Sequence, residues 1–146
     1  MTSLIDNNID ELIKRARQRT AVSDMVFMTA YPPREMPNPI TKYTVAVNQT
    51  GVNCSQAFVG DTVGAGLKGA LYEIKLTLRV YAPRNTSASA LLRMSTQLFD
   101  ALEASDRDQM IAGLSLAPII FDNAARTIYR DLYVTLSCLL IGEGAR

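Results

Sequence analysis

The chain has 146 residues, 48% of them hydrophobic and 20% charged, which suits one domain with a core that needs no metal or disulfide to hold it. Fifteen Lys and Arg against fourteen Asp and Glu leave a net charge of +1, so no global field draws the chain to nucleic acid or to an anionic membrane. The sequence lacks histidine, which excludes Ser/His/Asp and Cys/His catalysis and every metal site built on imidazole.

The N-terminal segment predicts an amphipathic helix of about four turns. Asp6, Asp10 and Glu11 interrupt its apolar residues, so it lacks the continuous apolar core of a signal peptide. The most apolar stretch, residues 132–141, is too short to span a bilayer, and we expect a soluble protein that is not exported by this route. The apolar positions on one face of the helix are Ile5, Ile9, Leu12, Ile13 and Ala16.

A proline-rich stretch follows the apolar run at residues 22–31. Four prolines between Pro32 and Pro39 are incompatible with a helix interior or a central strand, which predicts an extended loop arm over residues 31–42. The next segment alternates apolar and polar residues from Tyr43 to Asn48, as a half-buried strand does.

Turn-forming residues end that first strand. They occupy positions 48–51, and a second short strand is expected over 52–59, so the two strands together predict a β-hairpin. Four glycines then fall within residues 60–69, and this composition predicts a loop arm over residues 60–70 that contacts another protein.

Within that loop, the sequence Gly64-Ala-Gly66-Leu-Lys-Gly69 matches the dinucleotide-binding fingerprint literally. The fingerprint requires a helix next, because the helix N-terminus receives the pyrophosphate. A strand is predicted there instead, so we expect no nucleotide at this loop. With no histidine and two cysteines, we also expect no metal, and no other cofactor site is predicted.

The clearest strand covers residues 71–81, with Tyr72 and the even positions to Val80 on one face and Tyr81 among the odd positions on the other. Residues 85–87 supply oxygens to cap a second helix that ends near Ser105. Two further strands follow, residues 114–121 with Pro118 keeping the strand from a central position, and residues 127–141. We expect these core residues: Ile9, Leu12, Ile13, Ile74, Leu76, Leu78, Leu98, Leu102, Val134 and Leu136.

This order of elements predicts one α+β domain over residues 1–146, with two helices packed on one face of a mainly antiparallel sheet in the order α-β-β-β-α-β-β.

The sequence contains few candidates for catalytic or binding residues. The carboxylates between Asp100 and Asp108 are best explained as a solvated helix end, and Cys138 as a buried inert thiol on an apolar strand face, whereas the role of Cys54 stays open. The arginines are dispersed among acids, which favours a salt-bridged surface over a nucleic-acid footprint.

The whole layout resembles the tail terminator proteins of long-tailed bacteriophages, also called tail completion or tail-to-head joining proteins. The resemblance covers roughly residues 4 to 142. The segments that carry it are the helix IDNNIDELIKRARQ, the strand YEIKLTLRVYAP, the capped helix TSASALLRMSTQLFDAL and the final strand YRDLYVTLSCLLIGE.

The resemblance implies a structural virion protein without catalytic residues, assembled in the host cytoplasm. Such proteins form a ring, expected here to be a hexamer, that caps the tail tube, ends tail polymerisation and joins the tail to the head or neck. The implied partners are other copies of the chain, the tail tube protein, a neck or connector protein and, in contractile tails, the sheath; DNA passes through the ring without sequence-specific contact.

Three alternatives remain open from the sequence. One is a head–tail connector or neck protein of the same particle. Another is a stand-alone small-molecule-binding or enzymatic α+β domain, which requires an apolar pocket with convergent polar groups, and the third is a DNA-binding module. For a ring, charged residues of the two arms and of the long strand are the candidate contacts with a neighbouring subunit or partner. These residues are Arg34, Glu35, Asp61, Lys68, Glu73, Lys75 and Arg79.

Overall fold

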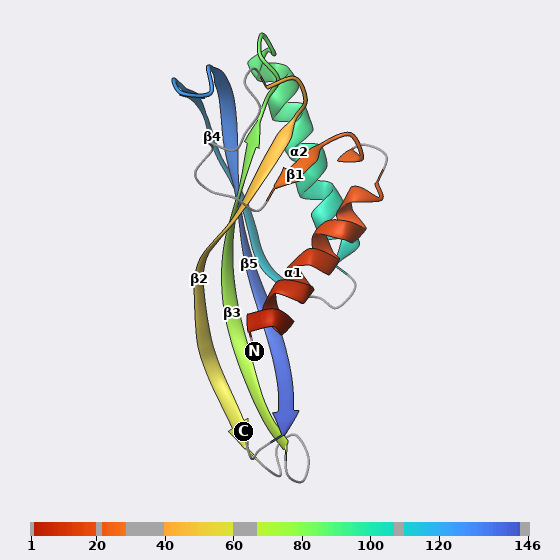
Figure 1. Cartoon of the computed structure of the whole chain (residues 1–146), viewed down its shortest axis with the longest axis vertical. Coiled ribbons are helices and arrows are strands. Elements are labelled where there is room, and N and C mark those ends of the chain that lie inside the picture. The colour runs from red at the N-terminus through yellow and green to blue at the C-terminus, as the bar shows by residue number, and fades with distance from the viewer. Residues whose placement is uncertain (1, 20–21, 29–39, 60–66, 107–109, 144–146) are drawn as a thin grey trace.

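The fold is taken from a computed structural model, which describes residues 2–19, 22–28, 40–59, 67–106 and 110–143. Figure 1 shows an elongated molecule in which long, curved strands run beside a shorter helical layer. The helices are α1 (Thr2–Arg17) and α2 (Ala88–Ser105), and the strands are β1 (Val26–Met28), β2 (Thr44–Val59), β3 (Leu67–Tyr81), β4 (Ile111–Asp122) and β5 (Thr127–Glu143).

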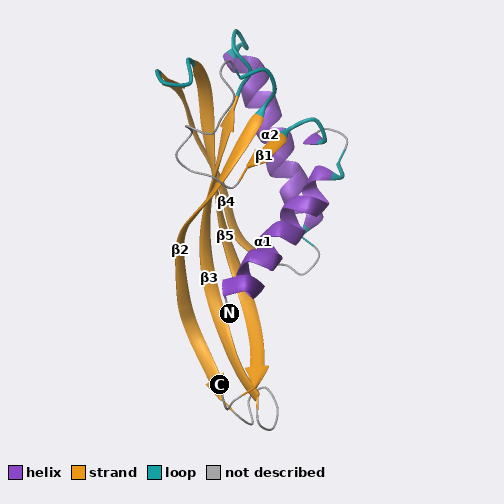
Figure 2. Cartoon of the chain, in the orientation of Figure 1, coloured by secondary structure: helices purple, strands orange, loops and turns teal. Residues whose placement is uncertain are grey.

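The strands form one five-stranded sheet in the order β1-β2-β3-β5-β4. Every neighbouring pair is antiparallel except β1 and β2, which are parallel. Both helices lie on the same face of this sheet (Figure 2). The predicted α+β class and the order α-β-β-β-α-β-β are therefore confirmed.

The core lies between the helices and the sheet. The apolar stripe of α1 and the stripe of α2 that begins at Leu91 pack against alternate residues of β3 and β5. This packing buries apolar side chains from segments that lie far apart in the sequence. Ile13 is partly buried, and the other predicted core residues are buried, namely Ile9, Leu12, Ile74, Leu76, Leu78, Leu98, Leu102, Val134 and Leu136.

The hairpin predicted over residues 43–59 is wrong, because this segment is one continuous strand, β2. Thr50 is an extra residue in the pairing with β3, so the turn signal marks a β-bulge, and Thr50 Oγ1 donates to the carbonyl of Lys75 at 3.2 Å. A Cβ at Gly51 would meet nothing within 4 Å, so packing does not demand this glycine. Three strands still precede α2, because the short strand β1 at residues 26–28 makes the third.

The prediction of a loop arm over residues 60–70 is wrong for residues 67–70, since β3 begins at Leu67, where it pairs with β5, and pairs with β2 from Lys68. Residues 60–66, like most of the arm expected over 31–42, lie outside the described residues. Within the arm expected over residues 31–42, Ile40 is described and is buried.

The ends of α2 and the edge position of β4 follow the predictions. Ser87 caps α2 by accepting a hydrogen bond from the Ala90 N–H at 3.2 Å, and the helix ends at Ser105. Pro118 lies in β4 at a register shift, where it removes no ladder bond from a central strand. Arg130 reaches across this shift and donates to the carbonyl of Ala117 at 2.7 Å.

Candidate functional site

Three strands extend beyond the helical layer and form what we call the β arm, made of residues 53–59 of β2, 67–73 of β3 and 137–143 of β5. At the base of the arm, Tyr72 and Cys138 still pack with the main core. Figure 1 shows these strand ends running past the start of α1. The register joins Asn53 to Glu73 and Glu73 to Ser137 at the base of the arm. At a rise of about 3.3 Å per residue, seven paired residues give an arm roughly 20 Å long.

Both edges of the β arm are open among the described strands. On one side, β1 pairs with β2 only as far as Ala46. On the other side, the pairing of β4 with β5 ends at Leu136, the Ser137 N–H still donates to the Met110 carbonyl at 2.7 Å, and the edge is open beyond that bond. An open edge presents unpaired backbone N–H and C=O groups, which are a template for a strand from another chain.

The charged residues predicted as contacts are not gathered at one place. Lys68 and Glu73 lie in the β arm, and Lys75 is exposed just above it on the same strand. Arg34, Glu35 and Asp61 lie outside the described residues.

Arg79, the remaining predicted contact residue, is held within the sheet by Asp131 on the face away from the helices. Its Nε donates to Asp131 Oδ1 at 2.8 Å and its Nη2 donates to Oδ2 at 3.1 Å, which is a bidentate ion pair. Its guanidinium also lies 4.1 Å from the ring centroid of Tyr129. The Arg79 side chain is 25% exposed and that of Asp131 is 10% exposed, so the ion pair is largely shielded from solvent.

Tyr81 belongs to the same cluster and is fully buried, although the sequence predicted only that it lies on this face. Its ring packs 5.4 Å from that of Tyr129, between centroids, and its hydroxyl donates to Asp122 Oδ2 at 3.3 Å. Burial raises the pKa of the Tyr81 hydroxyl above its usual value, and the Arg79 hydrogen bond opposes this shift. The cluster is thus a small second core, which also includes Ile40.

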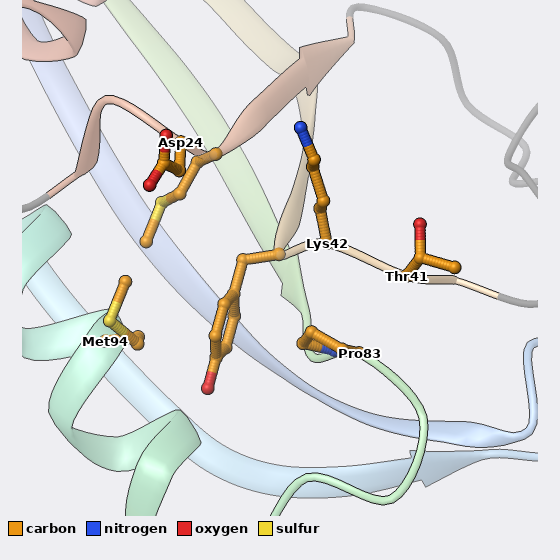
Figure 3. A pocket seen from close by; sticks show the side chains of 7 residues that line it. Asp24, Thr41, Lys42, Pro83 and Met94 are labelled. Atoms are coloured by element: carbon orange, nitrogen blue, oxygen red, sulfur yellow. The ribbon is translucent and has the colours of Figure 1, made fainter.

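A cleft of about 470 Å³ lies where the chain enters β2 and leaves β3 (Figure 3). Figure 3 shows Asp24 and Met94 on one side of it and Thr41 and Pro83 on the other. Tyr43 also lines the cleft, and burial raises the pKa of its hydroxyl while the charge of Arg93 lowers it. Its described lining residues combine opposite charges with apolar groups, and none of them is a nucleophile that hydrogen-bonds to a base.

A second cleft of about 440 Å³ lies between α1 and the short strand β1. Asp10, Lys14 and Arg17 line it from the helix, and Phe27 lines it from the strand. The Arg17 guanidinium lies 5.5 Å from the Phe27 ring centroid, so these two lining side chains are in cation–π contact with each other.

The acidic residues and cysteines considered above as possible catalytic groups can now be placed in the structure. Asp106 accepts backbone hydrogen bonds from Met110 and Ile111, both at 2.8 Å, and so fastens the start of β4. Cys138 is buried, as predicted, with its Sγ 3.8 Å from the sulfur of Met110, whereas Cys54 is exposed. Among the described residues, no three Cys, Asp or Glu side chains are grouped so that they hold a metal ion.

Neither helix, within the part of the chain that the structure describes, is both long and apolar enough to cross a membrane. No protein-family model matches the sequence, and no curated protein matches it.

Sequence reasoning missed the open edges of the β arm, because it divided β2 into a hairpin and began β3 four residues late. It also missed the partners of Arg79. Their signal was present in the alternation of Tyr129, Asp131 and Tyr133, which places all three on one face of β5. What alternation does not give is the register that brings Asp131 opposite Arg79.

Proposed function

We propose that the chain is a structural virion protein of a long-tailed bacteriophage, a tail terminator that forms a ring on the tail tube. In this role it ends tail polymerisation and joins the tail to the head or neck, and it carries out no catalysis. The supporting observation is the β arm, which projects beyond the helices and has no neighbouring strand at either edge among the described residues. A projecting sheet with two open edges suits a protein that works by binding copies of itself.

The proposed partners are the tail tube protein on one side of the ring and a neck or connector protein on the other, with the sheath added in a contractile tail. DNA passes through the ring lumen without base-specific contacts. The near-zero net charge is consistent with this role, because copies with a charge of +1 repel one another little at long range.

Imaging of assembled particles tests the proposal. Antibody-labelled protein should occur as one ring per particle at the head end of the tail, and tails made without the protein should have irregular, excessive lengths. Label distributed along the tube, or tails of normal length without the protein, would contradict it. Label at the portal side of the neck would instead support a head–tail connector of the same particle.

The two clefts keep small-molecule binding as a second candidate function, since volumes of about 470 and 440 Å³ fall within the usual range for ligand sites. Asp24 and Lys42 provide opposite charges at the first cleft. A thermal-shift screen of zwitterionic and aromatic metabolites tests this function. A saturable rise in melting temperature that disappears in Lys42→Ala would favour it over the ring.

A further inference from the structure

The direction of the backbone groups along the open edge of β5 follows from one hydrogen bond. Ser137 donates its N–H to the carbonyl of Met110 at 2.7 Å, on the side away from β3. Backbone groups of successive strand residues point to opposite sides, and β5 pairs with β3 without a register shift as far as Glu143. Leu139 and Ile141 therefore direct their N–H and C=O groups to the open edge, whereas Leu140 directs its groups to β3.

The same alternation can be carried across the sheet to β2. Leu140 pairs with Ala70, so Ala70 directs its backbone groups to β5 and not to β2. Ala57 is opposite Ala70 and Val59 is opposite Lys68, and both therefore direct their N–H and C=O groups away from β3. The bond from the Ala82 N–H to the Ile128 carbonyl, at 3.0 Å, fits the same alternation.

Neither edge has a sequence that discourages pairing with another chain. Charged residues and prolines on an edge are the usual protection against such pairing. The sequence has neither from Gln49 to Val59, nor from Ser137 to Gly142. The bulge between Cys54 and Gln56 lies nearer the base of the arm, and the register from Gln56 to Val59 is regular.

From these edges we infer that the β5 edge of one copy pairs in parallel with the β2 edge of the next copy, so that the arms form one continuous intersubunit sheet. Both β2 and β5 run from the body of the molecule toward the tip of the arm. Joining them with all arms pointing the same way therefore makes a parallel junction. This inference rests on the proposed ring and specifies its interface.

Head-to-tail pairing is favoured because it satisfies both edges. A twofold dimer joined through two β5 edges, or through two β2 edges, has its arms in opposite directions and leaves the other edge of each copy open. A closed ring of head-to-tail contacts leaves no open edge, as in a β-barrel. The occupant of each edge is thus a second copy of this chain.

Proline variants test the pairing through the backbone alone. Leu139→Pro removes an N–H that points to the open edge, so the ladder with β3 is kept, and Leu139→Ala controls for loss of the side chain. Leu140→Pro removes a bond to β3 and should destabilise the domain. Native mass spectrometry over rising protein concentration reads the assembly, and circular dichroism reads the fold.

We expect the wild type and Leu139→Ala to form a closed oligomer at high concentration, and Leu139→Pro and Ala57→Pro to remain folded monomers. Amide hydrogen exchange of peptides covering residues 55–59 and 138–143 should slow on assembly of the wild type. A ring that persists in both proline variants would overturn the pairing but leave the proposed terminator function intact. A wild type that stays monomeric at every concentration would also overturn the pairing, while the imaging experiment still decides the function.

Discussion

At the residue scale, the stability of the fold depends on apolar residues of β3 that pack under both helices. Leu76 is 3% exposed, so Leu76→Ala should lower the free energy of unfolding by about 2 to 5 kcal/mol through lost burial and the cavity that remains. Lys75 is the matched control, because it is exposed on the opposite face and Lys75→Ala should change stability by no more than about 0.5 kcal/mol. Urea denaturation compares the two, and equal effects would contradict the assigned faces.

Tyr81 predicts how stability depends on alkaline pH. Burial raises the pKa of its hydroxyl in the folded protein above the usual 10.0, so folding favours the protonated form. Tyr81 therefore contributes stability that is complete below pH 10.0 and is lost as the pH rises through the raised pKa. The free energy of unfolding should fall as the pH rises above about 10, and it should fall less in Tyr81→Phe.

Denaturant unfolding at several pH values measures both proteins. Tyr43 also has a pKa raised by burial, so part of the alkaline loss should remain in Tyr81→Phe. The informative quantity is the difference between wild type and variant, because general alkaline effects on other groups cancel in it. Parallel pH curves for the two proteins would show that Tyr81 ionises without a cost to folding.

At the element scale, α2 begins at a side-chain cap that the sequence identified. Ser87 accepts a hydrogen bond from the Ala90 N–H, so Ser87→Ala should lower the free energy of unfolding by about 0.5 to 2 kcal/mol. Ser89 lies in the first turn of the same helix and is exposed, which makes Ser89→Ala the control for loss of a hydroxyl. Thermal melting monitored by circular dichroism should separate them. A larger loss of stability in Ser89→Ala than in Ser87→Ala would contradict the assignment of Ser87 as the cap.

The sequence predicted the features that depend on local interactions, and it failed for those that depend on contacts between distant segments. Local periodicity located both helices, and every predicted core residue except the partly buried Ile13 is buried, because burial repeats every two residues in a strand and every three or four in a helix. The pattern at residues 48–51 failed, since a turn and a β-bulge use the same small polar residues and only pairing with β3 distinguishes them. The open edges depend on which strands are neighbours, and that is set by the whole sheet.

At the scale of the whole molecule, the β arm separates two tasks. The helices and the upper sheet hold the core that stabilises the domain, whereas the arm contributes strands whose outer backbone groups have no described strand beside them. Changes that alter only the arm edge should therefore affect assembly more than folding. Because of this separation, mixing two edge variants that both fold can test whether the arms pair head to tail.

Ala57→Pro blocks the β2 edge and keeps the β5 edge, and Leu139→Pro does the reverse. Under head-to-tail pairing, each variant alone has no edge of the complementary kind to bind, so each should stay at the 16.0 kDa of one chain. An equimolar mixture should form dimers of one copy of each variant, because the intact β5 edge of the first meets the intact β2 edge of the second and both remaining edges are blocked. Native mass spectrometry with one variant isotope-labelled identifies the composition of each dimer. Homodimers of either variant alone would show pairing of like edges, and a mixture that assembles beyond dimers would show that the ring contacts lie outside the β arm.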